Sequence, residues 1–305
     1  MFRKERYGRI LVPMVTPFKQ NQSVDFNAAA NVARKLIEDN KADSLILTGT
    51  TGEFFTMTFE ERTKIFEVVK EAVGDTIPLI AGVGAASTAE AIKLSKKAEQ
   101  VGIELVMVVS PYYTRPSAKE LHNHFMSVAK AIKIDMILYN IPLFAGVNIG
   151  PDMVAELAKV NNIVGIKEEA EINPKQITEF IRRTPDDFII YCGDDVMILE
   201  AFAQGGDKRM GGVVSGGSHL IGDRLRKMIE TFLAGDIEKA AKMQQSFFPL
   251  FRSLSPGDRC NPCCLLKDAM RLIGYDAGIP RLPLIPGTKD EIAQVEKVMK
   301  DLGLV

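Results

Sequence analysis

A lysine at the end of an apolar segment is the first residue of this sequence that could do chemistry. The run 163–166 is short and apolar, as buried strands are, and it leads directly to Lys167 and two glutamates. Lysine is among the residues least often fully buried. Desolvation lowers the pKa of an amine, and a neutral amine can attack a ketone to form a Schiff base. We interpret Lys167 as such a nucleophile, and an ion pair with Glu168 or Glu169 is the alternative.

Tyr139 lies in the β-rich segment 136–142 that precedes this one along the chain, 28 residues before Lys167. A phenol beside an imine can transfer protons while the imine forms and hydrolyses. The alternative is an amphipathic residue at a strand end, with its hydroxyl in water. If the two strands are neighbours, the pair indicates covalent catalysis on a carbonyl compound.

The elements that would position these side chains alternate along the chain. Eight β-rich runs are separated by helical patterns, and crossovers of this length predict parallel strands. The runs are nearly continuously apolar, as parallel strands covered on both faces are. They are 9–18, 44–50, 77–84, 105–111, 136–142, 163–168, 188–195 and 210–216.

Helix starts are marked between these runs. Ser87 and Ser117 each stand three residues before a glutamate, which is the capping-box pattern. Pro151 and Pro174 stand where a helix should begin, and proline is favoured at the first helical position. We expect helices to start at all four places.

Two architectures fit this alternation, a closed (β/α)8 TIM barrel and an open doubly wound sheet. Eight even units favour the barrel, and the segment after the first run lacks the Gly-rich dinucleotide loop of the open sheet. We predict an α/β fold with a catalytic barrel over 1–235. The pattern then becomes helical only, which predicts a C-terminal extension (236–305) packed on the barrel, with helices at 236–253, 262–274 and 289–303.

The active site of a TIM barrel lies at the C-terminal ends of its strands. Here "GTTGE" offers hydroxyls and backbone N–H groups that suit a carboxylate, and Gly52 permits close approach; a plain turn is the alternative. The segment "SPYYTRP" holds two phenols between prolines, which suits a site, a subunit contact or both. The predicted strand ends carry Thr50, Thr51, Gly52, Glu53, Pro111, Tyr112, Tyr113, Tyr139, Asn140, Lys167, Gly193, Asp194, Asp195, Ser215, Gly216 and Gly217.

Composition excludes several functional classes. The 305 residues carry a net charge of −1, which gives no electrostatic basis for binding nucleic acid or an anionic membrane. No apolar stretch approaches the roughly 20 residues of a membrane span, and the N-terminus does not have the pattern of a signal peptide. Four cysteines do not make a disulfide scaffold in a chain of this size. We therefore expect a cytoplasmic protein.

Two segments resemble known functional motifs, but each has a simpler structural explanation. The pair Cys260 and Cys263 has metal-ligand spacing, but no second pair lies nearby, and entry into a helix is the preferred interpretation. The Gly-rich segment 205–217 lacks the order of a phosphate-binding loop and is interpreted as the turn of the eighth strand. The three histidines form no ligand pattern.

Several segments match one family in combination. They are "GTTGEF" with "EER" downstream, "GVGAASTAEAIKLSKKAEQVG", "SPYYTRPS", "YNIP" and "GIKE" at their Tyr-to-Lys spacing, and "NP…LK" before "RLPLIP". Over nearly its whole length the chain resembles the dihydrodipicolinate synthase / N-acetylneuraminate lyase family of pyruvate-dependent class I aldolases. The resemblance implies a barrel with C-terminal helices and a homotetramer built as a dimer of dimers.

The resemblance also implies a role for each matching residue. Lys167 would form the imine with pyruvate or another 2-keto acid, and Tyr139 would be the general acid and base. Thr50 and Tyr113 would complete a proton relay, with Tyr113 reaching in from a neighbouring subunit. The covalent imine would take the place of a cofactor, and no metal would be needed. Predicted substrate-binding positions are Thr51, Gly52, Phe144, Gly193, Asp195, Val214 through its carbonyl, and Ser215.

Departures from the family pattern bear on the substrate. Synthases of the lysine pathway have Ser-Arg after "YNxP", where the arginine holds the carboxylate of the aldehyde, but this chain has Leu143 and Phe144. Sialic-acid lyases have an acid pair where this chain has Asp195 and Val196. A sugar acid shorter than sialic acid, or a less polar aldehyde acceptor facing Phe144, fits this sequence better than the substrates of those two branches.

The predicted function is therefore that of a Schiff-base aldolase or lyase. It would cleave or form a carbon–carbon bond between pyruvate and an aldehyde, with a 2-keto-3-deoxy sugar acid as the preferred substrate type. The alternatives are dihydrodipicolinate (4-hydroxy-tetrahydrodipicolinate) synthase, which condenses pyruvate with aspartate semialdehyde, and a keto-deoxy acid dehydratase. A barrel that binds a keto acid without turnover is the non-enzymatic alternative.

Overall fold

The computed structural model describes residues 3–169, 175–259 and 261–305. In these residues the strands follow one another around a closed parallel barrel in the order β1 to β8. The predicted TIM-barrel fold is confirmed. The strands are β1 (Ile10–Pro13), β2 (Ser44–Leu47), β3 (Leu79–Gly82), β4 (Leu105–Val109), β5 (Asp135–Asn140), β6 (Ile163–Glu168), β7 (Ile189–Cys192) and β8 (Met210–Val214).

Each strand lies within the β-rich run that predicted it, or overlaps it closely, and almost every strand position is buried. The observed strands are mostly shorter than the runs, because the chain turns out of the sheet before the runs end. After β2, for example, Thr48 takes a left-handed backbone conformation with φ of 50°. Thr50 therefore lies in a turn beyond the strand.

Helices separate the strands and continue after the last one. The helices of the described residues are α1 (Arg3–Tyr7), α2 (Phe26–Glu38), α3 (Phe59–Val73), α4 (Thr88–Val101), α5 (Ala118–Ala131), α6 (Pro142–Ala145), α7 (Pro151–Leu157), α8 (Gln176–Arg183), α9 (Ile198–Arg209), α10 (Ser218–Leu233), α11 (Ile237–Leu254), α12 (Cys263–Leu272) and α13 (Lys289–Asp301), with a 3₁₀ turn, η1, at Phe54–Thr56. None of them has the length and hydrophobicity that a membrane span requires.

Most of the predicted helix starts are confirmed. Ser117 forms a complete capping box with Glu120, and the Ser87 side chain accepts a hydrogen bond from the Glu90 backbone. Pro151 is the first residue of α7. Pro174 lies outside the described residues, and so does Cys260, whereas Cys263 begins α12 as the helix-entry interpretation expects.

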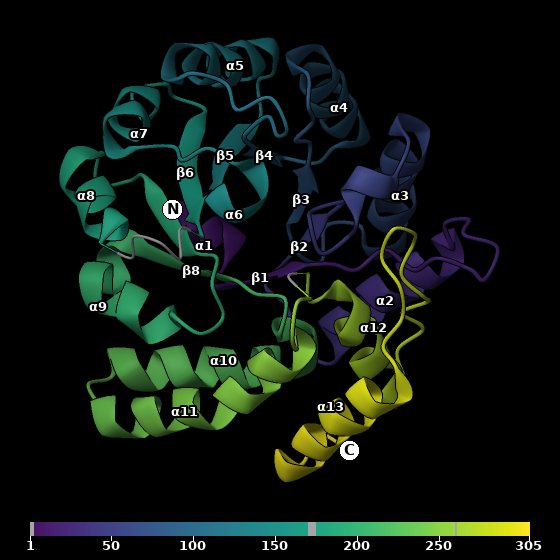
Figure 1. Cartoon of the computed structure of the whole chain (residues 1–305). Coiled ribbons are helices and arrows are strands. Elements are labelled where there is room, and N and C mark those ends of the chain that lie inside the picture. Colours follow the sequence, from purple (N-terminus) through teal and green to yellow (C-terminus); the bar gives the residue numbers. More distant parts are fainter. Residues whose placement is uncertain (1–2, 170–174, 260) are drawn as a thin grey trace. The chain divides into compact units, whose positions relative to one another are not determined.

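The chain divides into two compact units. Unit 1 comprises Met1–Arg9 and Pro78–Val214, and it holds β3 to β8. In this unit α4 packs on α5, α5 on α7, α7 on α8 and α8 on α9 (Figure 1). Gly165 allows β6 and β7 to approach, because a Cβ there would lie 2.4 Å from the carbonyl oxygen of Ile189.

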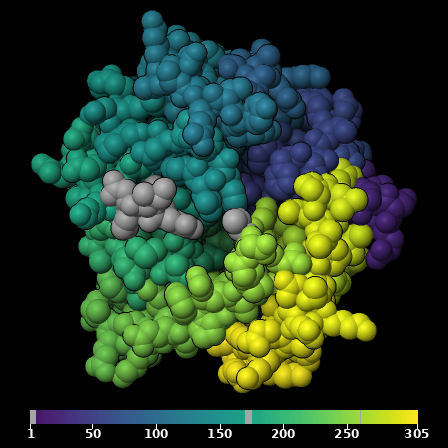
Figure 2. Space-filling view, viewed as in Figure 1, coloured from purple at the N-terminus to yellow at the C-terminus, as the bar shows by residue number. Residues whose placement is uncertain are grey.

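Unit 2 comprises Ile10–Ile77 and Ser215–Val305. Its helices α10 and α11 lie side by side, and α13 packs on α11 and α12 (Figure 1). In Figure 2 the yellow C-terminal residues of this unit adjoin its purple N-terminal residues, as the hydrogen bond from Arg281 to the Gln22 carbonyl also shows. The predicted division of the chain at residue 235 stays a prediction.

Family motifs that lie far apart in the sequence meet inside unit 2. The fully buried Lys267 Nζ pairs with Glu53 and donates to the carbonyl oxygens of Thr16 and Ile279 at 2.7 and 2.9 Å. Arg281 forms a second ion pair with Glu61 at 2.8 Å. A buried ammonium that lost such partners would remain without compensation for its lost hydration. These charged motif residues therefore hold the unit together.

Two buried histidines are neutral at ordinary pH. His219 Nε2 accepts from the Val15 backbone N–H, its Nδ1 donates to the Gly216 carbonyl, and burial lowers its pKa to about 4. His124 Nδ1 lies 2.9 Å from the Thr88 hydroxyl, and burial likewise lowers the pKa of His124 to about 4. No carboxylate of the described residues contributes to the pKa shift of either ring.

The histidines should make the fold sensitive to acid. Between pH 6.5 and 4 the unfolded chain takes up protons at both rings and the folded chain does not, so stability falls as the pH falls through this window. The loss should be on the order of 3 kcal/mol for each histidine. Urea unfolding at several pH values should show that His124→Gln flattens this dependence. A slope equal to that of the wild type would contradict the assignment.

Candidate active site

Lys167 lies in a buried ion pair near the end of β6. Its side chain is 7% exposed, and its Nζ lies 2.8 Å from Glu169 Oε2. The same Nζ lies 4.0 Å from the centre of the Tyr139 ring. The ion pair that the sequence offered as the alternative for Lys167 is thus formed in the structure, with Glu169 as the partner.

The register of β5 and β6 brings Tyr139 beside the lysine. Tyr139 is directly opposite Lys167, and Asn140 is opposite Glu168. Paired positions of adjacent strands point to the same face of a sheet, so the phenol and the amine share one face. The Tyr139 hydroxyl donates to Glu169 Oε2 at 2.9 Å. One carboxylate oxygen therefore contacts both groups that the sequence singled out.

The electrostatics of Lys167 differ from the expectation. Burial by itself lowers the pKa of Lys167, but the negative charge of Glu169 and the hydroxyl of Tyr139 raise it by more, and the net pKa is raised. The prediction of a lowered pKa is wrong for this arrangement, because it counted desolvation without a neighbouring carboxylate. The amine carries its proton here and must release it before it can attack a carbonyl.

The two glutamates after Lys167 have different surroundings. Glu168 is buried and accepts hydrogen bonds from the side-chain amides of Asn140 at 3.0 Å and Gln176 at 3.3 Å. Asn148 completes this group through hydrogen bonds with Asn140 and Gln176. Glu169 stands two residues beyond Lys167, and alternation along a strand predicts residues i and i+2 on one face. The sequence contained this signal, but the prediction from it left both acids open as partners of the lysine.

Gly193 packs directly against the ion pair. A Cβ at this position would lie 2.7 Å from Lys167 Cε and 2.8 Å from Glu169 Cβ. Its backbone N–H also donates to the Glu168 carbonyl at 2.7 Å. Gly193 was predicted to bind substrate; in the structure its lack of a side chain makes room for the lysine and the glutamate.

Other predicted site residues of unit 1 lie at strand ends or in the loops after them. Val214 ends β8, Asp195 follows β7, and Phe144 lies 40% exposed on α6. Tyr113 is 94% exposed and takes a left-handed conformation with φ of 77°. The described residues of its own unit leave this phenol almost uncovered. Its predicted place in a neighbouring subunit's site stays a prediction.

Thr50, Thr51, Gly52 and Ser215 belong to unit 2, and their predicted roles stay predictions. The two threonines are half-buried in the turn after β2. Gly52 packs closely against the backbone of Met14, because a Cβ at position 52 would lie only 2.9 Å from the Met14 carbonyl oxygen. The Ser215 hydroxyl accepts a hydrogen bond from the backbone N–H of Ser218 at 2.9 Å. Ser218 is the first residue of α10, so this bond lies at the start of that helix.

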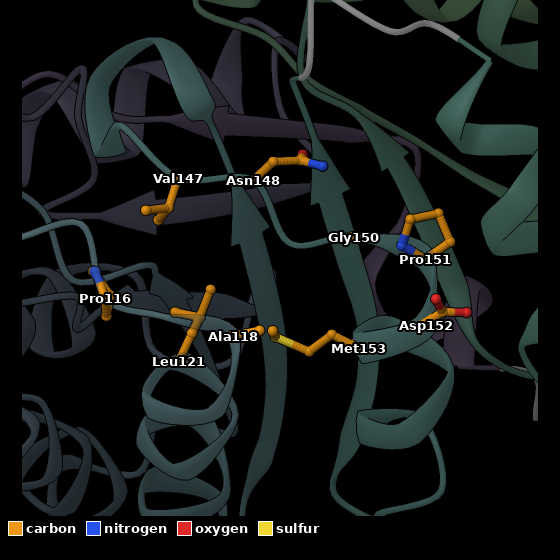
Figure 3. A pocket seen from close by; sticks show the side chains of 9 residues that line it. All are labelled: Pro116, Ala118, Leu121, Val147, Asn148, Gly150, Pro151, Asp152 and Met153. Carbon is orange, nitrogen blue, oxygen red and sulfur yellow. The ribbon is translucent and has the colours of Figure 1, made fainter.

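A cavity of about 430 Å³ lies elsewhere in unit 1, between α5 and α7. Figure 3 shows its lining of Pro116, Ala118, Leu121, Val147, Asn148, Gly150, Pro151, Asp152 and Met153. Its walls are mainly apolar, and Asn148 and Asp152 are their polar side chains. The described residues also contain no cluster of His, Cys, Asp or Glu that could hold a metal ion. Among the described residues of this unit, Lys167, Tyr139 and Glu169 bring an amine, a phenol and a carboxylate into contact.

Comparison with known proteins identifies the relatives of this chain. The sequence model that describes the dihydrodipicolinate synthetase family matches residues 6–302 of this chain. The 4-hydroxy-tetrahydrodipicolinate synthase of Moorella thermoacetica is 39% identical over 300 residues, which cover 98% of this chain and 100% of that protein.

The similar solved structures are also dihydrodipicolinate synthases. A dihydrodipicolinate synthase of Bacillus anthracis has a TM-score of 0.90 and 38% identity, covering 96% of this chain and 98% of its own. A monomeric dihydrodipicolinate synthase variant has a TM-score of 0.89 and 31% identity, covering 100% and 99%.

The fit of Gly193 can be tested by adding one methyl group. Gly193→Ala should lower the free energy of unfolding by about 1–3 kcal/mol, because the Cβ overlaps Lys167 and Glu169. Gly150→Ala is the matched control, since its φ is −68° and no atom lies within 4 Å of its added Cβ. Urea denaturation measures both variants. A Gly193→Ala variant as stable as the control would show that the packing around the ion pair is looser than these distances indicate.

Proposed function

Because the chain belongs to the dihydrodipicolinate synthetase family, and is therefore a class I aldolase-type enzyme of the lyase class, we propose that it joins pyruvate to an aldehyde through an imine at Lys167. The observation that carries the proposal is the register of β5 and β6, which places Tyr139 beside the lysine in a buried site. The sequence put a 2-keto-3-deoxy sugar acid first and the synthase second. The names of the relatives favour the second.

The proposed reaction begins when Lys167 Nζ, after losing its proton, attacks the ketone carbon of pyruvate. Loss of water leaves an iminium ion, whose positive charge allows the methyl carbon to lose a proton and become an enamine. The enamine carbon then attacks the aldehyde carbon. In the proposal Tyr139, whose ring lies 4.0 Å from Nζ, gives and takes protons where the carbon–carbon bond is made or cleaved. The imine is the covalent link to substrate, and the proposal requires neither a cofactor nor a metal.

The remaining roles are carried by the family resemblance. In the proposal Thr50 and Thr51 bind the carboxylate of pyruvate, and a neighbouring subunit's Tyr113 joins the relay. The exposure of Tyr113 supports a subunit contact at this phenol. We propose a homotetramer on these grounds, and the relative described as a monomeric variant makes oligomeric state a property to be measured.

The aldehyde partner depends on what replaces the arginine of the lysine-pathway synthases. Leu143 and Phe144 are 54% and 40% exposed and cannot bind a carboxylate. Arg115 lies against the end of the same short helix, since a Cβ on Gly146 would lie 3.2 Å from Arg115 Nε. This exposed guanidinium has no hydrogen bond or ion pair with the described residues. We propose that Arg115 supplies the cation for the carboxylate of aspartate semialdehyde.

Borohydride trapping tests the imine. Incubation with pyruvate and borohydride should add the mass of a reduced pyruvyl group to the peptide that contains Lys167. Lys167→Met should abolish the adduct, while Lys159→Met, which removes an exposed surface lysine, should leave it unchanged. Peptide mass spectrometry measures both. Lack of an adduct on the wild-type protein would end the proposed function.

The proposed role of Arg115 predicts that its loss weakens binding of the aldehyde and leaves the reaction with pyruvate unchanged. Arg115→Gln should raise the KM for aspartate semialdehyde by about 10- to 100-fold, the value of a charge-assisted hydrogen bond. Pyruvate trapping at Lys167 should be unaffected, and Arg182→Gln on the surface of α8 is the control. Turnover of sugar-derived aldehydes in place of aspartate semialdehyde would instead restore the sugar-acid interpretation.

A further inference from the structure

Glu169 is the residue of the site for which the proposed reaction so far has no use. We propose that Glu169 is the proton carrier of imine formation, taking the proton from Lys167 and returning it to the departing water. The inference rests on the proposed function, because it requires a ketone to attack. It concerns a single carboxylate, whose contacts distinguish it from Glu168, the other acid that follows the lysine.

The geometry of Glu169 suits proton transfer to two partners. Its Oε2 lies 2.8 Å from Lys167 Nζ and accepts the hydroxyl hydrogen of Tyr139 at 2.9 Å. Both distances are those of direct hydrogen bonds, within which a proton can move without an intervening water. The Glu169 side chain is 23% exposed while that of Lys167 is 7% exposed. The carboxylate can therefore exchange protons with solvent on behalf of a buried amine.

The backbone holds Glu169 in this position. Its N–H donates to the Asn140 carbonyl at 3.0 Å, which continues the pairing with β5 beyond the last residue of β6. Its Cβ lies in the space that the missing side chain of Gly193 leaves. Glu168 cannot take its place, because that carboxylate accepts the amides of Asn140 and Gln176. Backbone pairing and the space beside Gly193 therefore fix the Glu169 carboxylate next to Lys167 Nζ.

Imine formation needs both an acceptor and a donor of protons at Nζ. The ammonium first gives a proton to Glu169, which becomes a carboxylic acid while the amine becomes neutral. The nitrogen lone pair then forms the C–N bond, and its remaining extra proton passes to the former ketone oxygen. Glu169 finally protonates that hydroxyl, the C–O bond breaks, and water leaves. The products are an iminium ion, a carboxylate and one water, so atoms and charge balance.

A second role for Glu169 predicts the opposite behaviour. If the carboxylate serves only as a counter-ion, it keeps Lys167 protonated and slows attack on the ketone. Its removal would then speed imine formation, because the amine would lose its proton more readily. If Glu169 carries the proton, its removal slows the same step. The sign of the change separates the two roles.

The test measures the rate of imine formation. Wild-type protein, Glu169→Gln and Glu169→Ala are mixed with pyruvate, treated with borohydride at timed intervals, and assayed for the adduct at Lys167 by mass spectrometry. Glu169→Gln should react about 100-fold more slowly at pH 7, the low end of general acid–base effects. Its rate should rise with pH, because solvent base must then remove the proton. Glu156→Gln on the surface of α7 is the matched control.

Chemical rescue gives a readout that a purely structural role would not move. Formate added to Glu169→Ala should restore part of the trapping rate, since it can occupy the space of the lost carboxylate. Thermal unfolding of each variant establishes that it is folded. If Glu169→Gln does not fold, Glu169→Asp is measured instead, and it should be slower than wild type because its carboxylate is shorter by one methylene.

The outcomes are distinct. A rate equal to or above that of the wild type in Glu169→Gln, or in Glu169→Asp when that variant is needed, overturns the assignment of Glu169 and leaves the proposed function intact. Failure of formate to restore Glu169→Ala counts against it in the same way. A wild-type protein that forms no adduct overturns the proposed function itself, together with this inference.

Discussion

The pairing of β5 with β6 is the constraint on which the rest of the site depends. Parallel strands align residues in a fixed register, and here that register sets Tyr139 opposite Lys167 and Asn140 opposite Glu168. The first pair faces one side of the sheet and forms the proposed reactive centre. The second pair faces the other side and joins a network of amides that holds the strand end. A slip by one residue would exchange the two faces and remove the amine from the site.

Burial and charge oppose each other at Lys167. An apolar barrel wall favours a neutral amine, but a carboxylate 2.8 Å away favours the ammonium more strongly, and the pKa is raised. A buried ammonium with a carboxylate at hydrogen-bond distance is a poor nucleophile at rest, yet it can be activated by a short proton transfer. The same contact that opposes the reaction in the resting protein can thus supply its proton pathway.

Several residues that match the family serve structure rather than chemistry. Glu53 and Glu61 come from segments near the N-terminus, while Lys267 and Arg281 come from the C-terminal helical region, and each acid pairs with one of the cations. The buried pair also draws in the carbonyl oxygens of Thr16 and Ile279. Similarity in these motifs therefore identifies the fold and its internal supports. It says less about which aldehyde the site accepts, a property that depends on the surroundings of Leu143, Phe144 and Arg115.

The sequence by itself indicated the barrel and singled out the lysine and the tyrosine, because periodicity and strand ends are local properties of the chain. It could not determine which glutamate meets Lys167, the direction of its pKa shift, or why position 193 is glycine. These depend on side-chain placement to within about an ångström, since Coulomb energy and steric overlap change steeply over such distances. Only the tertiary structure sets those distances, and it placed Glu169 where the sequence had shown only two acids in a row.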